Sequence, residues 1–408
     1  MRIFPFHYAW WIVFSGILTL FSCLGLARFA FGMLLPGMGE GLGLGYDQMG
    51  YLGTGNFVGY LLSVAMTPIL LKVFRPRITI VVGLIIIAAT LAGVSQSVSF
   101  IQLLLFYSLT GIGSGLANIS TMVLIAHWFR REKRGRAAGL MVLGNGVGII
   151  FAGLLIPFFH RIYGTDGWRV SWLLLALISL VVAVFTALIV RNEPQSLGLT
   201  PLGDELPFSE KEISTAPVPH AGRVLVSLGL LYSAFGATYM VYGTFMVTSM
   251  VEEYGFSEAT AGQFWSWVGF FGLFSGVLFG ALSDRIGRKQ GLMAVFFVQT
   301  MAYLLVGSGW GGWTLWMSVV LYGIAAFAIP AIMTAAVSDY LGIARAAAGF
   351  SLITFFFAGG QTVGPAVAGL IAEKSGSFSP AFLASALVTT VACVFALTLP
   401  QPSGDKHG

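Results

Sequence analysis

Long apolar stretches recur along the whole sequence, and they constrain the fold more than any other feature. A helix needs roughly 20 mostly apolar residues to cross about 30 Å of hydrocarbon, and twelve such stretches can be read from the chain. They lie near residues 9–35, 47–71, 78–97, 100–126, 135–159, 168–191, 223–250, 258–283, 290–309, 312–337, 346–372 and 379–399. With 57% hydrophobic and only 9% charged residues, the chain is predicted to be an all-α membrane protein with twelve transmembrane helices.

The basic residues indicate how these spans are oriented. If the N-terminus is cytoplasmic, 17 of the 21 Lys and Arg residues fall on the cytoplasmic side, and only Arg161, Arg169 and Lys374 fall on the other. This asymmetry follows the positive-inside rule. We therefore predict a multi-pass protein of the bacterial inner membrane with both termini in the cytoplasm. The net charge of +5 is then a property of the loops and does not indicate a nucleic-acid partner.

One long polar stretch, residues 192–222, separates six predicted spans from six others. Its Pro, Ser and acidic residues are typical of a flexible linker. We predict an N-terminal six-helix bundle at 1–191, a cytoplasmic linker at 192–222, a C-terminal six-helix bundle at 223–399 and a cytoplasmic tail at 400–408. The even division indicates two pseudo-repeats.

The segment "GALSDRIGRK", Gly280–Lys289, resembles the loop signature of the major facilitator superfamily and lies between the eighth and ninth predicted spans. With twelve spans and a central linker, this resemblance covers essentially the whole chain. It implies the major facilitator fold and a secondary transporter whose halves rock around a central site by alternating access. Three segments, "HWFRREKRGRAAGL", "GWRVSWLLLA" and "RNEPQSLGLTPLGDE", resemble the monocarboxylate and oxalate/formate carrier branch. Two others, "ARFAFGMLLPGM" and "FGATYMVYGTF", resemble the bacterial YbfB-type group.

The charges of the Gly280–Lys289 loop also have a physical interpretation of their own. Asp284 follows the eighth span on the cytoplasmic side, where it can pair with Arg285 or Arg288. Such a pair would hold the inner mouth shut in one conformation and break when it opens. We interpret these three residues as a gate. The alternative is that the basic residues only supply positive-inside charge.

Arg28 lies inside the first predicted span, about eight residues, or roughly 12 Å, from its outer end. A charge inside the membrane is costly and is by default a functional-site hypothesis. All 16 Asp and Glu residues lie in loops or at span ends, so no embedded carboxylate balances Arg28. A lone guanidinium favours an anion, above all a carboxylate that it can bind with two hydrogen bonds. We predict a small, monocarboxylate-like organic anion as the substrate. Two alternatives stay open: snorkelling of Arg28 to the outer surface, and an ion pair with Glu252 or Glu253.

Uncharged polar and aromatic side chains within the spans are candidates to complete the binding site. These candidates are Asn56, Asn118, Thr121, Asn145, Tyr239, Tyr242, Trp267 and Gln361. The same kinds of group commonly hydrogen-bond between helices in lipid, so each also has a structural interpretation.

The mode of energy coupling stays open between proton symport and anion exchange, because no acid lies deep in a span. Asp47, Glu252 and Glu253, near the outer mouth, are the candidate protonation sites. An exporter of a drug or neutral metabolite, and a non-transporting receptor or channel, remain alternative functions. No acid/base pair, nucleophile with a base or metal-ligand cluster can be assembled, so we predict no enzyme activity. Cys23 and Cys393 both fall in spans and indicate no metal site. We expect a monomer without cofactor or metal, whose partners are the lipid bilayer, the substrate and, under symport, protons.

Overall fold

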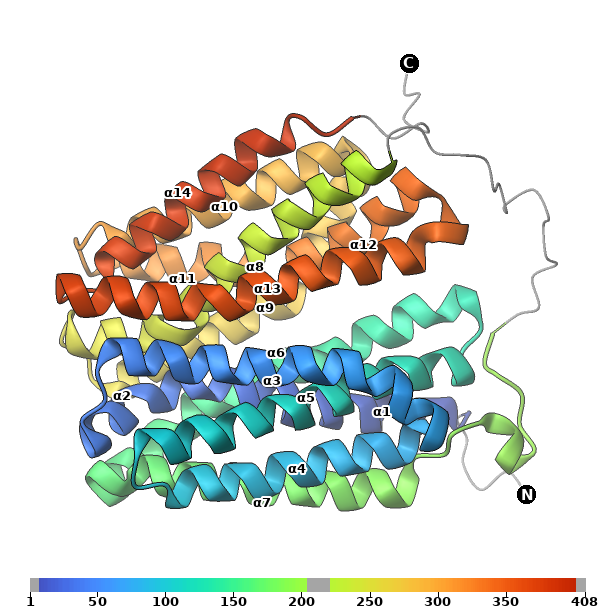
Figure 1. Ribbon diagram of the computed structural model, residues 1–408, viewed down its shortest axis with the longest axis horizontal. Coiled ribbons are helices and arrows are strands. Elements are labelled where there is room, and N and C mark those ends of the chain that lie inside the picture. The colour runs from blue at the N-terminus through green and yellow to red at the C-terminus, as the bar shows by residue number, and fades with distance from the viewer. Residues whose placement is uncertain (1–6, 204–220, 401–408) are drawn as a thin grey trace. The chain divides into compact units, whose positions relative to one another are not determined.

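The computed structural model describes residues 7–203 and 221–400, and these residues are almost entirely helical (Figure 1). The helices of the chain up to the polar stretch are α1 (Ala9–Leu20), the π-helix η1 (Phe21–Phe29), α2 (Ala30–Leu42), α3 (Tyr46–Val73), α4 (Pro76–Gln96), α5 (Phe100–Trp128), α6 (Arg131–Tyr163), the 3₁₀-helix η2 (Gly164–Asp166), α7 (Gly167–Ile189) and the 3₁₀-helix η3 (Pro194–Leu197). Those after it are α8 (Ala221–Glu252), α9 (Glu258–Ile286), α10 (Arg288–Gly307), α11 (Trp313–Ala325), α12 (Ala328–Leu341), α13 (Ile343–Ser375) and α14 (Ser379–Ala396).

Within the described residues, eleven segments are long and apolar enough to cross a membrane. One of them, Lys133–Ile189, contains both α6 and α7, so the number of crossing helices is twelve. The first crossing combines α1, η1 and α2, and the tenth combines α11 and α12. Inside hydrocarbon every backbone polar group needs a partner within the protein, and helices provide one locally. The predicted all-α architecture is confirmed.

Most span boundaries lie within a few residues of those predicted, but the end of the first span is wrong. The helix continues through Pro36 to Leu42 and ends at Gly43, whose φ of 62° terminates it in the left-handed conformation. Much of the predicted linker, residues 204–220, and residues 401–408 of the predicted tail lie outside the described residues.

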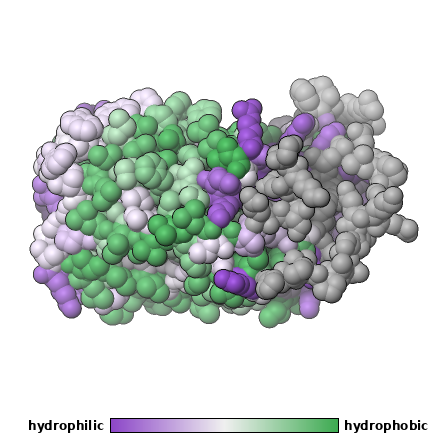
Figure 2. All heavy atoms as spheres, turned by 90° about the horizontal axis from the view of Figure 1, so that it is seen from above, coloured by the Kyte–Doolittle hydropathy of each residue, from purple (hydrophilic) through white to green (hydrophobic). Residues whose placement is uncertain are grey.

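Apolar side chains cover most of the face drawn in Figure 2, and hydrophilic side chains gather toward either side of this apolar surface. Many large apolar residues are exposed, among them Val277 at 77% and Leu188 at 66%. A soluble protein seldom exposes so much contiguous apolar surface, whereas a lipid bilayer is its natural environment.

The chain divides into two compact units. The first comprises Met1–Leu44 and Gly55–Pro207, and the second comprises Gly45–Thr54 and Phe208–Gly408. In the first unit α4 packs along both α5 and α7, and Figure 1 shows α4 beside α7. In the second unit α8 packs along α13, and α10 packs along α14.

Glycines bring two helix pairs of the first unit into very close contact. A Cβ atom built on Gly111 of α5 would lie 1.9 Å from the carbonyl oxygen of Asn56 on α3, and one built on Gly59 would lie 1.9 Å from that of Ser108. Gly25 of η1 meets Gly148 of α6 in the same way, at 2.7 Å from its Cα. Small residues of this kind let membrane helices approach backbone to backbone. These two contacts fix α3 against α5, and η1 against α6.

Candidate functional site

Arg28 lies in η1, the π-helical segment in the middle of the first span. Such segments inside α-helices occur frequently at functional sites. Because the span continues to Leu42, Arg28 is 14 residues from its C-terminal end, the end predicted to be the outer one, or about 21 Å at 1.5 Å per residue. The predicted separation of eight residues from the end of the span is therefore wrong.

The guanidinium of Arg28 lies against aromatic rings of α3. Its Cζ atom is 4.4 Å from the ring centroid of Tyr60 and 4.8 Å from that of Phe57, within the range of cation–π interactions. Arg28 is only 9% exposed. Within the part of the chain that the structure describes, Arg28 forms no ion pair with an acid, and its buried Nε and Nη2 atoms have no hydrogen-bond partner. The Nε–H and Nη2–H groups point in the same direction and form the fork that binds a carboxylate through two parallel hydrogen bonds.

A predicted site residue, Asn118 of α5, holds the ring of Tyr60. The Asn118 Nδ2 atom donates a hydrogen bond of 2.9 Å to the Tyr60 hydroxyl. Arg28, Tyr60 and Asn118 thus form a connected group from η1, α3 and α5, all within the first unit. Phe57 and Tyr60 were not among the predicted site residues. The only signal in the sequence is their spacing of three residues, which places them on one face of a helix.

The other candidates of the first unit have different surroundings. Asn56 donates from Nδ2 to the carbonyl of Tyr107 at 3.0 Å, while its buried Oδ1 atom has no partner among the described residues. The Tyr107 hydroxyl in turn donates to the carbonyl of Arg28 at 3.5 Å. Asn145 is 4% exposed, and its Oδ1 also has no partner within the described chain. Thr121 donates to a carbonyl one turn earlier in its own helix, an interaction that satisfies its hydroxyl locally.

In the second unit, the structure brings together Tyr239 of α8 and Gln361 of α13. Gln361 donates from Nε2 to the Tyr239 hydroxyl at 3.1 Å, and its Oε1 atom is buried without a hydrogen-bond partner among the described residues. Tyr239 belongs to a stack of nearly parallel rings with Tyr232, Phe235 and Phe357. This cluster, which we call the aromatic stack, offers apolar ring surface without charge, and the Oε1 atom of Gln361 adds a buried acceptor.

Two further candidates of the second unit do not join the aromatic stack directly. Tyr242 stacks on Tyr322 with ring centroids 3.8 Å apart, and its hydroxyl lies 3.0 Å from the Oγ atom of Ser318. Both contacts are fully buried and are typical of a structural core. Trp267 is 42% exposed, and its ring contacts other surface aromatics such as Trp316.

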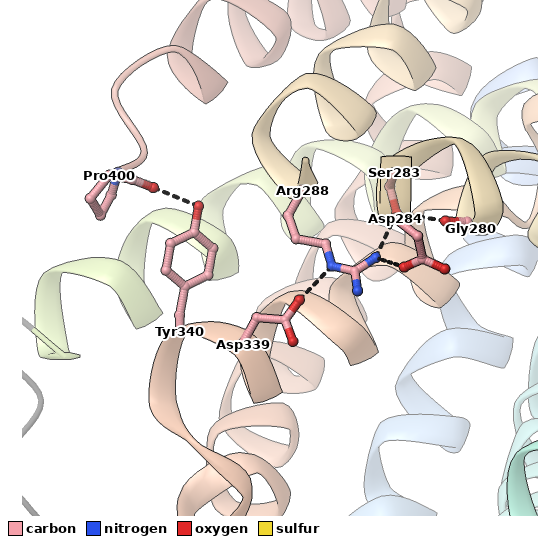
Figure 3. A network of polar contacts seen from close by, with 7 residues as sticks. All are labelled: Gly280, Ser283, Asp284, Arg288, Asp339, Tyr340 and Pro400. Atoms are coloured by element: carbon pink, nitrogen blue, oxygen red, sulfur yellow. Dashed lines mark hydrogen bonds and ion pairs between the residues drawn. The ribbon is translucent and has the colours of Figure 1, made fainter. Parts of the chain in front are cut away.

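The predicted gate residues lie where α9 ends and α10 begins, and Figure 3 shows the contacts of Asp284 and Arg288. Arg288 forms an ion pair with Asp284 and donates from Nε to Asp339 at 2.6 Å. It also donates from Nη1 to the Ser283 hydroxyl at 2.8 Å. Arg285 is exposed at the end of α9. Asp339 was not predicted, because in the sequence it stands 55 residues from Asp284. The structure adds it as a second carboxylate for Arg288.

The three candidate protonation sites lie in the second unit and already have hydrogen-bond donors. Asp47 accepts from the backbone N–H of the next residue at 2.7 Å. Glu252 accepts from the Tyr46 hydroxyl at 2.7 Å, and Glu253 accepts from the backbone N–H of Phe378 at 2.5 Å. The described residues contain no group of three or more His, Cys, Asp or Glu side chains that could hold a metal ion.

Residues 17–342 and 228–408 match the sequence profile of the Major Facilitator Superfamily, and the chain belongs to that superfamily. It is 23% identical to the hexuronate transporter of Bacillus subtilis over 396 residues, which cover 92% of this chain and 91% of the relative. It is 25% identical to the multi-drug resistance efflux pump PmrA of Streptococcus pneumoniae over 379 residues, covering 89% and 90%.

Among solved structures, the crystal structure of a D-xylose–proton symporter superposes with a TM-score of 0.76 at 16% identity, covering 98% of this chain and 99% of the symporter. This likeness shows the twelve-helix, two-repeat fold. Together with membership of the superfamily, it makes the chain a multi-pass secondary transporter of a small molecule and not an enzyme.

Proposed function

We propose that the chain transports a small organic anion of the monocarboxylate type across a bacterial plasma membrane by alternating access, and that Arg28 binds the carboxylate of that anion. The observation that carries the proposal is the burial of the Arg28 guanidinium without hydrogen-bond partners from the described residues for two of its nitrogen atoms. Arg28 is nine-tenths buried in the middle of a span, and those two atoms are Nε and Nη2.

The energetics favour a ligand over a structural role. A buried donor without a partner costs about 1–3 kcal/mol, and more when it is charged. A structural arginine is expected to have a carboxylate or several carbonyls around its nitrogens. A carboxylate ligand would satisfy Nε and Nη2 together and would neutralise the charge. A hexuronate, named for the Bacillus subtilis relative, is itself a carboxylate, and the segments that resemble the monocarboxylate branch agree with this substrate class.

The neighbouring residues have distinct roles in this proposal. Asn118 provides an amide beside Tyr60, whose ring contacts the guanidinium, and Asn56 and Asn145 each have a buried amide oxygen that accepts no hydrogen bond within the described residues. These amide oxygens suit hydroxyl groups on a substrate. Coupling is by proton symport or by anion exchange.

The Arg288 network is the proposed cytoplasmic gate. Arg288 of α10 contacts carboxylates of α9 and α12, and all three helices belong to the second unit, so the network would respond to a shift among these helices. Asp284 and Asp339 are both substantially exposed, and exposed ion pairs of this kind contribute little net stability. Weak contacts are suitable for a gate because they break readily.

Export of a drug or neutral metabolite is the second candidate function, and the aromatic stack favours it. The stack offers ring surface, and Gln361 adds one acceptor without a charge. The efflux pump of Streptococcus pneumoniae is a relative over most of both chains. A neutral aromatic substrate would bind there without needing Arg28.

Reconstituted protein tests the two functions directly. Uptake of labelled monocarboxylates, dicarboxylates and neutral sugars into vesicles is measured for the wild type, Arg28→Gln and Arg161→Gln. Arg161 is the matched control because it is an exposed arginine that also lies over a ring, Phe158, at 5.9 Å. We expect Arg28→Gln to abolish anion uptake and Arg161→Gln to leave it unchanged.

Binding provides an independent measurement, because an anion at 100 times its Kd adds about 2.7 kcal/mol of stability to the protein that binds it. Anions should raise the Tm of the wild type but not of Arg28→Gln, whose own unfolding should remain cooperative. Anion transport with unchanged affinity in Arg28→Gln would refute the assignment. Stabilisation by neutral compounds alone would favour the second function.

A further inference from the structure

Resting on this function, we propose that the rings of Phe57 and Tyr60 serve as the counter-charge of Arg28 when no substrate is bound, and that they thereby allow the empty carrier to reorient. A carrier that binds an anion at a single arginine faces a difficulty after it releases that anion. It must return across the membrane with a bare buried cation, and a bare cation in a low-dielectric interior is strongly disfavoured. Without compensation, such a carrier would exchange one anion for another but would not return empty.

The geometry provides that compensation without an acid from the described parts of the chain. Two rings of α3 contact the guanidinium, at 4.4 Å and 4.8 Å from Cζ. The face of an aromatic ring carries partial negative charge, and its attraction for a cation is greatest where water is excluded. Phe57 is 4% exposed and Arg28 is 9% exposed, so their contact is largely shielded from water, whereas Tyr60 is partly exposed.

A carboxylate binds an arginine through the edge of the guanidinium, here Nε and Nη2, whereas aromatic rings contact its planar face. Nε and Nη2 are themselves buried, so a substrate reaches them only when neighbouring groups move. The hydrogen bond from Asn118 to the Tyr60 hydroxyl gives that ring a defined position beside Arg28. The ring contacts can therefore persist after the anion has left, when the cation has no other partner in this proposal.

The ring contacts should affect net efflux and exchange differently. If the rings stabilise the empty state, the carrier catalyses net efflux as well as exchange. Loss of a ring face should slow the return of the empty carrier, while exchange, in which Arg28 always crosses with an anion, should be much less affected. Phe57 and Tyr60 are positioning residues in this scheme, because they act through Arg28.

The test compares net efflux with exchange in vesicles loaded with the labelled monocarboxylate that the wild type transports best. External buffer without substrate reports net efflux, and external unlabelled substrate reports exchange. We expect Tyr60→Leu and Phe57→Leu each to lower net efflux about tenfold, which corresponds to about 1.4 kcal/mol in the barrier, while exchange changes less than about twofold. Phe57→Tyr keeps the ring face and should keep the wild-type ratio.

The outcomes separate this inference from the function on which it rests. If Arg28→Gln abolishes anion flux but both leucine variants keep the wild-type ratio of efflux to exchange, the ring hypothesis alone is overturned. It is also overturned if the leucine variants lower both fluxes equally, since the rings would then act in folding or substrate binding. Anion flux that persists in Arg28→Gln refutes the proposed function, and this inference with it. Should Tyr60→Leu fail to insert, Phe57→Leu provides the same comparison.

Discussion

Replacement of Gly111 by alanine tests whether the close approach of α3 and α5 sets the geometry of the Arg28 site. The added Cβ would lie 1.9 Å from the carbonyl oxygen of Asn56, whereas ordinary contact begins at 3.4 Å. Both sides of this contact are backbone, so no side chain can rotate out of the way. The helices must therefore separate locally by about 1.5 Å, the difference between those two distances.

This separation has an energetic and a functional effect. Overpacking of a well-packed contact typically costs about 1–3 kcal/mol, and about 2 kcal/mol corresponds to a Tm lower by roughly 4–8 °C for a unit of 150–250 residues. The hydrogen bond between Asn118 of α5 and Tyr60 of α3 is 2.9 Å long, and an increase of 1.5 Å would break it. Gly111→Ala should therefore lower both the Tm and the apparent affinity for the anion that we propose as the substrate.

Thermal unfolding in detergent, followed by the reactivity of the buried thiol of Cys23, measures the effect on stability. The matched control is Gly139→Ala on α6, where a new Cβ would meet no atom within 4 Å. Alanine is the better helix former by about 1 kcal/mol, so this control should keep or slightly raise the Tm. If Gly111→Ala unfolds at the same temperature as Gly139→Ala, the interpretation of the helix contact is incorrect.

Two further predictions concern the loop between α9 and α10. Asp339→Asn should lower the free energy of unfolding by less than about 1 kcal/mol, because Asp284 still pairs with Arg288. The difference in Tm between the wild type and this variant should shrink in 1 M salt. A difference that does not depend on salt would contradict the electrostatic explanation. Gly287→Ala should lower the free energy of unfolding by about 1–3 kcal/mol, because residue 287 has a φ of 94°, which strains a residue with a side chain. Gly280→Ala, where a new Cβ meets no atom within 4 Å, is its control in the same thermal assay. Equal Tm values for the two variants would contradict the strain.

The fold was predictable because each membrane helix makes its own backbone hydrogen bonds and can be recognised in the sequence by its length and its mean hydropathy. The one clear boundary error shows the limit of this reasoning. After Leu35 the sequence continues "PGMGEGL", which in a soluble protein would indicate a turn. In the membrane protein the helix passes through Pro36, and ends only at Gly43, where the backbone becomes left-handed. Proline inside such a helix is tolerated because neighbouring groups satisfy the freed carbonyl.

The candidate site was predictable only where charge identified a residue. Arg28 stands out because a cation in an apolar run has no ordinary explanation. Its neighbours could not be identified in this way, because Phe57 and Tyr60 are common residues of a membrane helix. Which rings reach Arg28 depends on the packing of η1 and α3, and that packing is tertiary. For the same reason Asp339 could not be connected with Arg288 from the sequence alone.

The π-helical register of η1 links these observations. A π-turn inserts about one extra residue into an α-helix, which at 3.6 residues per turn rotates the following residues by about 100° relative to those before. The face on which Arg28 lies therefore cannot be extrapolated from the α-helical residues of α1. Gly25, in the same segment, packs backbone to backbone on Gly148 of α6, which holds η1 in place. The altered register and this contact together direct a permanent cation toward the rings of α3, where no acid of the described residues pairs with it and where we propose that a carboxylate binds.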